Sequence, residues 1–135
     1  MNDSETVVLS FPRKAPYFAV ARLVVGGLAA PLEMSYDALD DLQLAISSLL
    51  DNEDLPAADQ LTLKLHVGDG SMRASLGRFP AESVEVAFRR SSDKEGELDL
   101  RKLLDTIVDG VEVAPDGDGH EWVTLTKKVK AEAVT

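Results

Sequence analysis

Residues 35–52 read SYDALDDLQLAISSLLDN and carry the most regular helical pattern in the chain. Apolar residues recur there every three or four positions, which places them on one face of an α-helix. These residues are Leu39, Leu42, Ile46 and Leu49. Ser35 is suited to cap the first backbone N–H groups, and the negative charge of Asp37 matches the positive end of the helix dipole. We therefore predict a helix over this stretch, packed on the core by its apolar face and ending in Asn52.

The residues before this helix predict a strand and another helix. Residues 6–11 turn alternate apolar side chains toward one face, as a half-buried strand does, and Pro12 ends that pattern. Pro16 suits the first turn of a helix, because the N–H that proline lacks has no partner there. Apolar residues then recur at helical spacing as far as Ala30. They are Phe18, Ala21, Val25 and Leu28.

The middle of the chain predicts strands. Residues 61–67 alternate leucine or valine with polar side chains, and residues 71–76 return as a hairpin partner across the turn at 68–70. Residues 83–88 alternate in a similar way, so we expect a third strand there. Residues 89–96 are polar, and we expect them to form a mobile connection.

The last third predicts a helix and a closing hairpin. Residues 98–108 have leucines and an isoleucine at helical spacing, and Gly110 is expected to stop this helix. Residues 111–114 and 121–127 are expected to pair across a glycine-rich turn.

This order of elements predicts an α+β fold. We expect a two-layer sandwich with a mixed, mostly antiparallel sheet and helices on one face. At 135 residues the chain is long enough for one compact domain, which we assign to residues 1–135. The ends, residues 1–5 and 130–135, are expected to be disordered.

Composition narrows the classes of function. The 24 acidic and 14 basic residues give a net charge of −10. This charge opposes binding to nucleic acid and favours a basic protein partner. Alternatively, it serves only to keep the protein soluble. No apolar run approaches the ~18 residues of a membrane span, and no secretory signal is evident. The absence of cysteine excludes disulfides and thiolate chemistry. We expect a cytoplasmic protein that neither binds nor crosses a membrane.

Four stretches together resemble a known family. They are AVARLV at residues 19–24, DDLQLAI at 40–46, LLDTIVDGVEV at 103–113 and EWVTLTKK at 121–128. In order and spacing they resemble the anti-sigma regulatory factors, small serine-protein kinases of the GHKL, or histidine-kinase-like ATPase, superfamily. The resemblance implies a histidine-kinase-like ATPase fold and a site for ATP and Mg²⁺.

Two positions on the helix of residues 35–52 bear on that site. The resemblance implies a glutamate that acts as catalytic base and, one turn later, an asparagine that helps to hold Mg²⁺ on ATP. In this chain the asparagine position falls on Asn52 and the glutamate position on Ser48. A serine hydroxyl does not titrate near neutral pH, so we expect no catalytic base at this position. Asn52 is a remnant Mg²⁺ and ATP position or, alternatively, a helix-end or turn residue.

Two further parts of the implied ATP site are altered. Where the family has an aspartate and spaced glycines, residues 75–80 read SLGRFP, with one glycine and no acid. The implied glycine-rich lid reads GELDL at residues 96–100, whose carboxylates would repel phosphate. We interpret the site as degenerate and expect no cofactor, with ATP and Mg²⁺ binding only if the site is retained.

The remaining candidates are weaker. The Gly-Asp-Gly triplets at 68–70 and 117–119 lie between strands and are interpreted as hairpin turns, and His66 and His120 stand apart from any ligand set, so we expect no metal site. Arg22 and Trp122 are candidates for partner binding. Trp122 adjoins the inward-facing Val123, so we expect its ring to face outward, where it could contact a partner or cover the sheet.

The resemblance implies a regulator that sequesters a sigma factor and is itself controlled by an antagonist, as a homodimer. One alternative is an active ATP-dependent serine kinase that phosphorylates the antagonist, with Asp51 or Glu53 as a substitute base. Another is a non-catalytic adaptor subunit of a different complex.

Overall fold

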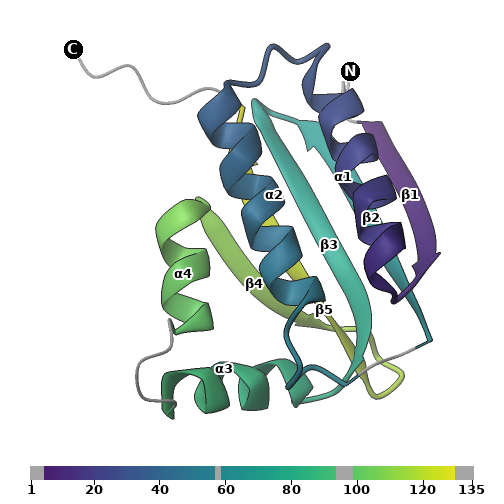
Figure 1. The fold of residues 1–135 in the computed structure, drawn as a ribbon, viewed down its shortest axis with the longest axis vertical. Helices are drawn as coiled ribbons and strands as arrows, with labels where there is room; N and C mark the ends of the chain where they lie inside the picture. Colours follow the sequence, from purple (N-terminus) through teal and green to yellow (C-terminus); the bar gives the residue numbers. More distant parts are fainter. Residues whose placement is uncertain (1–4, 57–58, 94–98, 130–135) are drawn as a thin grey trace.

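The computed structural model describes residues 5–56, 59–93 and 99–129, which form helices layered on an antiparallel sheet (Figure 1). In chain order the elements are β1 (Glu5–Pro12), α1 (Ala15–Ala29), α2 (Tyr36–Leu50), β2 (Gln60–Gly68), β3 (Ser71–Pro80), α3 (Ser83–Asp93), α4 (Leu100–Ile107), β4 (Gly110–Pro115) and β5 (His120–Lys128).

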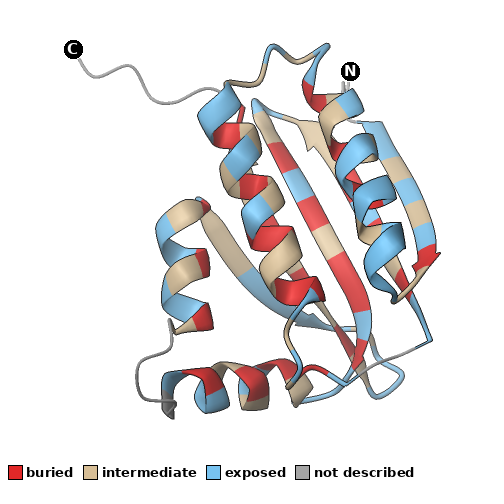
Figure 2. Cartoon of the chain, in the orientation of Figure 1, coloured by how far each residue is buried: buried red, intermediate tan, exposed pale blue. Residues whose placement is uncertain are grey.

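The sheet has the order β1-β2-β3-β5-β4, and every neighbouring pair is antiparallel. The helices cover one face of the sheet (Figure 1), and buried residues alternate with more exposed ones along the strands (Figure 2). The buried residues face the helices, whereas the residues of the opposite, open face are mostly polar. The register sets this division, because residues paired directly across strands share a face. Leu65, for example, pairs with Ala74, which pairs with Leu125. The predicted α+β sandwich is confirmed.

The helix predicted over residues 35–52 is α2, and it lies at the centre of the helical layer (Figure 1). Its apolar face is buried, with exposed fractions of 0–3% for Leu42, Ala45, Ile46 and Leu49. Ser35 caps it by accepting a hydrogen bond from the backbone N–H of Ala38 at 3.1 Å. The helix ends at Leu50, so Asn52 lies just beyond it.

The strand predicted over residues 83–88 is wrong: this stretch begins helix α3. The alternating apolar residues of this stretch fit a strand. The three-residue spacing of Val84 and Ala87, which are both fully buried, fits a helix equally well. The chain leaves β3 through Glu82, whose φ of 69° breaks the extended run. The helix continues to Asp93, so residues 89–93 are not the predicted mobile connection, and residues 94–96 lie outside the described residues.

The last predicted helix is shorter than expected. Helix α4 begins at Leu100, where the carboxylate of Asp99 accepts hydrogen bonds from the N–H groups of Arg101 and Lys102. It ends at Ile107, one residue before the predicted end at Val108, and Gly110 already belongs to β4.

The expectations for the chain ends fall mainly outside the described residues. Residues 1–4 and 130–135 are not described. Glu5 was expected to be disordered, but it pairs with Val67 as the first residue of β1.

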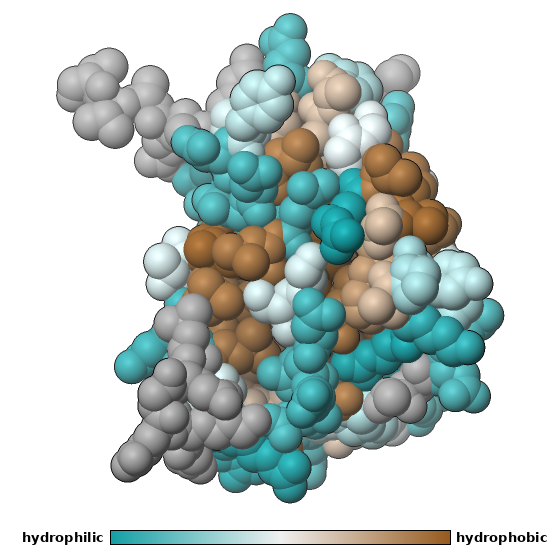
Figure 3. Space-filling view, viewed as in Figure 1, coloured by the Kyte–Doolittle hydropathy of each residue, from teal (hydrophilic) through white to brown (hydrophobic). Residues whose placement is uncertain are grey.

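Hydrophobic side chains also reach the surface. Figure 3 shows several of them on the helical face, among hydrophilic neighbours. The large exposed ones on α1 and α2 are Tyr17, Val20, Leu23, Tyr36 and Leu44. Among the described residues, no helix is both long enough and apolar enough to cross a bilayer.

The cap on α2 generates a stability prediction. Replacing Ser35 by alanine removes the acceptor for the Ala38 N–H, so the free energy of unfolding in urea should fall by about 1 kcal/mol. Ser48→Ala is the matched control, because Ser48 lies within the same helix and its loss should change stability little. Equal losses in the two variants would contradict a capping role for Ser35.

Candidate functional site

Two positions of the implied ATP site, Ser48 in α2 and Asn52 just beyond its end, are both engaged in local hydrogen bonds. Ser48 Oγ donates to the carbonyl oxygen of Leu44, one turn earlier, at 2.8 Å. Asn52 Oδ1 accepts from the backbone N–H of Asp54 at 2.9 Å, which is the geometry of an asparagine turn. A hydroxyl that donates into its own helix offers no carboxylate base, and the Asn52 side-chain oxygen already has a donor.

Arg13, which follows β1, holds the loop after α2. Its guanidinium donates four hydrogen bonds at 2.8–3.3 Å to backbone carbonyls of that loop. The acceptors belong to Leu50, Asn52, Leu55 and Pro56. The pKa of Arg13 is lowered, because partial burial outweighs the effect of the nearby Asp51 carboxylate, which raises it. Because guanidinium has five donors in a rigid fork, one side chain satisfies carbonyls that the end of a helix leaves open.

The start of α3 is capped by a residue from a distant strand. Glu121 of β5 is 8% exposed, and its carboxylate accepts from the backbone N–H groups of Glu82 at 2.9 Å and Val84 at 3.0 Å. A carboxylate is stabilised at a helix N-terminus by the free N–H groups and the helix dipole. We did not predict this role of Glu121 from the sequence. The alternation of β5 could have indicated it, because it places Glu121 on the same inward face as the buried Val123 and Leu125.

Two open hollows flank the loop after α2. The first, of about 340 Å³, lies between this loop and the start of α3, with Asp54 and Arg90 across it at 3.7 Å. The second, of about 380 Å³, lies beside Arg13 and Phe18. The residues around the first are Asp54, Pro56, Ala81, Glu82, Ser83, Val86 and Arg90, and those around the second include Asp51 and Glu53. A chain of phosphates in either hollow would meet carboxylates.

The glycine in residues 75–80 has a packing role. A Cβ on Gly77 would lie 2.7 Å from Trp122 Cε3, so the indole covers this glycine on the open face of the sheet. Lys64 Nζ lies 4.3 Å from the centre of the same indole, a cation–π contact. Gly77 therefore accommodates a tryptophan of its own chain. Trp122 faces outward as expected.

Arg22 and Trp122, the two candidates for partner binding, are not brought together. Arg22 is exposed on α1, in the helical layer, and its carbonyl accepts a hydrogen bond from Gln43 Nε2. Trp122 lies on the opposite face of the sheet, so the two cannot share one flat interface. Their roles in partner binding stay predictions.

The implied lid falls largely outside the described residues. Gly96, Glu97 and Leu98 are not described, and of the remaining two, Asp99 caps α4 and Leu100 is buried. Among the residues that the structure covers, no three histidine, aspartate or glutamate side chains are grouped as metal ligands.

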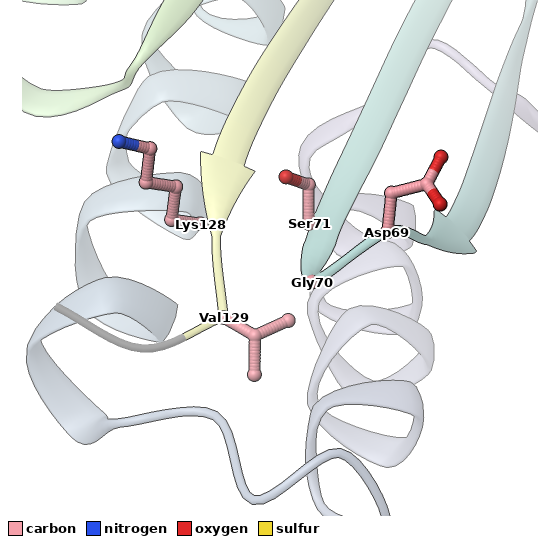
Figure 4. Close-up of a pocket in the computed structure, with 5 residues that line it drawn as sticks. All are labelled: Asp69, Gly70, Ser71, Lys128 and Val129. Atoms are coloured by element: carbon pink, nitrogen blue, oxygen red, sulfur yellow. The ribbon is translucent and has the colours of Figure 1, made fainter. Parts of the chain in front are cut away.

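The Gly-Asp-Gly triplets are hairpin turns. Asp69 and Gly70 have φ values of 54° and 72° between β2 and β3, and Gly117 and Gly119 have φ values of 83° and 77° between β4 and β5. A hollow of about 330 Å³ lies at the first turn, where the Asp69 and Lys128 side chains point apart (Figure 4). Neither turn precedes a helix, so neither has the geometry of a phosphate loop.

Comparison with known proteins establishes kinship. No family model matches the chain. It is 26% identical over 148 residues to the serine-protein kinase RsbW of Bacillus cereus (strain B4264), covering 99% of this chain and 91% of that protein. The serine-protein kinase RsbW of Bacillus mycoides (strain KBAB4) matches with the same identity and coverage. The chain is thus a homologue of RsbW proteins, and the predicted resemblance is confirmed.

A solved structure agrees in fold. The crystal structure of the RsbU and RsbW domains of Rv1364c from Mycobacterium tuberculosis superposes with a TM-score of 0.64 over 93% of this chain, at 17% sequence identity. The chain spans 32% of that longer chain. This likeness concerns the fold, and it confirms the predicted architecture.

The contact between Gly77 and Trp122 predicts a destabilising substitution. Gly77→Ala would place a methyl group against the indole, so the free energy of unfolding should fall by about 1–3 kcal/mol. Gly27→Ala is the matched control, since nothing lies within 4 Å of its Cβ position in α1, and it should stabilise by about 0.5–1 kcal/mol. A neutral Gly77→Ala would contradict the packing role.

The turn after β4 predicts a pH dependence. Hydrogen bonds from Trp122 and Arg78 lower the pKa of the Asp116 carboxyl below its usual value. Its stabilising effect is therefore complete above the unfolded value of about 3.9 and is lost as pH falls through the lower folded value. Asp116→Asn should be less stable than wild type at pH 7, and the difference should vanish in acid.

Urea unfolding measured from neutral to acid pH checks this. Asp118→Asn is the control, because Asp118 also pairs with Arg78 but is 77% exposed, and its deficit should be smaller. A deficit for Asp116→Asn that stays constant down to the lowest pH would contradict the prediction.

Proposed function

We propose that this chain is an anti-sigma-factor-like regulator that acts by binding protein. It sequesters a sigma factor in the cytoplasm, is itself controlled by an antagonist, and works as a homodimer. The observation that carries the proposal is homology to RsbW proteins over 99% of the chain, combined with serine at position 48, where the family resemblance implies a catalytic glutamate.

The contacts around α2 and α3 support weak or lost ATP binding. Ser48 donates to its own helix, Asn52 is held in a turn, and Glu121 supplies the anion at the start of α3. Asp51, Glu53 and Asp54 add negative charge in the same loop. The carboxylates would repel a polyphosphate. The side chains of Ser48 and Asn52, already engaged, would offer it no hydrogen-bond partner.

The surface supports protein binding. The net charge of −10 favours a basic partner through long-range attraction. On α1, Leu23 is 75% exposed and adjoins Arg22, so the helix presents apolar surface beside a cation. Apolar residues and arginine are the usual anchors of protein interfaces.

An active serine kinase is the second candidate, because the homologues carry the name serine-protein kinase. It would require Asp51 or Glu53 to replace the missing base. Both side chains are exposed and lie beyond the last turn of α2. An adaptor role in another complex is the third.

Two measurements on the full chain test the proposal. Isothermal titration with a purified sigma factor, encoded near this protein, should show a complex without nucleotide. Thermal melting with MgATP should show no stabilisation, whereas a ligand at ~100 times its Kd would contribute about 2.7 kcal/mol. Failure to bind any sigma factor contradicts sequestration, and phosphate transfer from ATP to an antagonist supports the kinase instead.

A charge reversal on α1 locates the contact. Arg22→Glu should weaken sigma binding by about tenfold or more, because it repels carboxylates that the arginine would pair with. Arg73→Glu is the matched control, since Arg73 is also exposed but lies on the open face of the sheet. If the control weakens binding and Arg22→Glu does not, the interface lies on the sheet.

A further inference from the structure

A fourth hollow, of about 290 Å³, lies among α3, α4, the edge strand β4 and its neighbour β5, and neither Arg13 nor Asn52 lines it. It combines apolar surface with carboxylates. Its lining residues are Glu82, Glu85, Phe88, Arg101, Val113 and Glu121.

The floor of this hollow is apolar surface that the fold leaves uncovered. Val113 pairs directly with Val123, so both side chains point to the helical face of the sheet. Val123 is fully buried, yet Val113 is 39% exposed, because the helical layer does not extend over this end of β4. Phe88 of α3 stands beside it and is half-buried. An inward-facing valine left open next to a phenylalanine is surface that gains from a covering group.

Three carboxylates and one cation, Arg101, line the hollow, so its net charge is negative. Within residues 5–56, 59–93 and 99–129, no ion pair engages Glu82 or Glu85. The Glu121 carboxylate is buried and accepts only backbone N–H groups in its hydrogen bonds. Carboxylates beside low-dielectric surface attract a cation more strongly than carboxylates in open water.

Arg101 shows that the aromatic wall accepts a guanidinium. Its Cζ lies 5.5 Å from the centre of the Phe88 ring. Its Nε also pairs with Asp105 at 3.1 Å, but the two side chains are 45% and 53% exposed, and such surface pairs contribute little. Arg101 is therefore held only weakly beside the Phe88 ring.

We propose that this hollow binds a lysine or arginine side chain from a basic segment of a protein partner. The aliphatic stem lies on Phe88 and Val113, and the cationic head lies among Glu82, Glu85 and Glu121. Charge complementarity selects this occupant. A second copy of the chain is a poorer occupant of this hollow, because the chain carries 24 acidic against 14 basic residues, and the proposed homodimer would use another face. The inference rests on the proposed function in taking this partner to be the sigma factor.

A small-molecule titration tests the hollow itself. N-acetyl-arginine amide should shift the methyl NMR signals of Val113 in a saturable way, and N-acetyl-citrulline amide, its neutral isostere, should bind about tenfold more weakly. Val8 is the internal control, since it is 58% exposed on the open face of the sheet. Equal shifts for the two probes, or equal shifts at Val8 and Val113, would overturn the proposal.

A charge reversal tests it in the complex. Glu85→Lys should raise the Kd for the purified sigma factor by about tenfold. Glu112→Lys, with the same charge change on the open face of β4, should leave the Kd nearly unchanged. An intact complex that tolerates Glu85→Lys sinks the inference and leaves the proposed function standing.

Two other outcomes are distinguishable. If wild type binds no sigma factor, the proposed function fails, and the arginine titration alone decides the hollow. If sedimentation shows that Glu85→Lys disrupts self-association instead, the occupant is a second copy and the proposal is overturned.

Discussion

The burial of one face of α2 against the sheet is the contact on which the other elements depend. Leu42 and Leu49 are fully buried, and each such leucine contributes about 1.5–3 kcal/mol. Lys127 of β5 extends the contact, because its Nζ binds the Asp41 carboxylate at 3.2 Å and the Ile107 carbonyl at 2.7 Å. The central helix, the last strand and α4 are thereby held together. The position of the loop after α2 follows from this packing.

Polar groups at the end of α2 and the start of α3 are used to complete the fold. Arg13 binds loop carbonyls, and Glu121 binds the first N–H groups of α3. Gly77 makes room for Trp122. Helix ends and glycines are the features that nucleotide sites exploit, because they leave N–H groups and backbone accessible. Once side chains of the same chain occupy them, an incoming nucleotide must displace those contacts.

Local patterns predicted most of the fold, and long-range contacts decided the rest. The alternation of β2 and the stripe and cap of α2 are visible in the sequence, since each depends on neighbours within a few residues. The strand predicted from Ser83 was wrong, because the apolar residues there fit the spacing of a helix as well as that of a strand. The deciding contact comes from Glu121, 37 residues beyond Val84. The clamp by Arg13 spans 37–43 residues and was invisible for the same reason.

The distribution of charge connects the fold to recognition. The hollow at Phe88 and Val113 joins apolar surface to three carboxylates, which suits a long cationic side chain and opposes phosphate. Contacts of this kind set specificity and association rate more than affinity, and they weaken with salt where they are exposed. Glu121 is the exception, because burial shields it from screening. A carboxylate that caps α3 and also faces a partner's cation would couple partner binding directly to the stability of that helix.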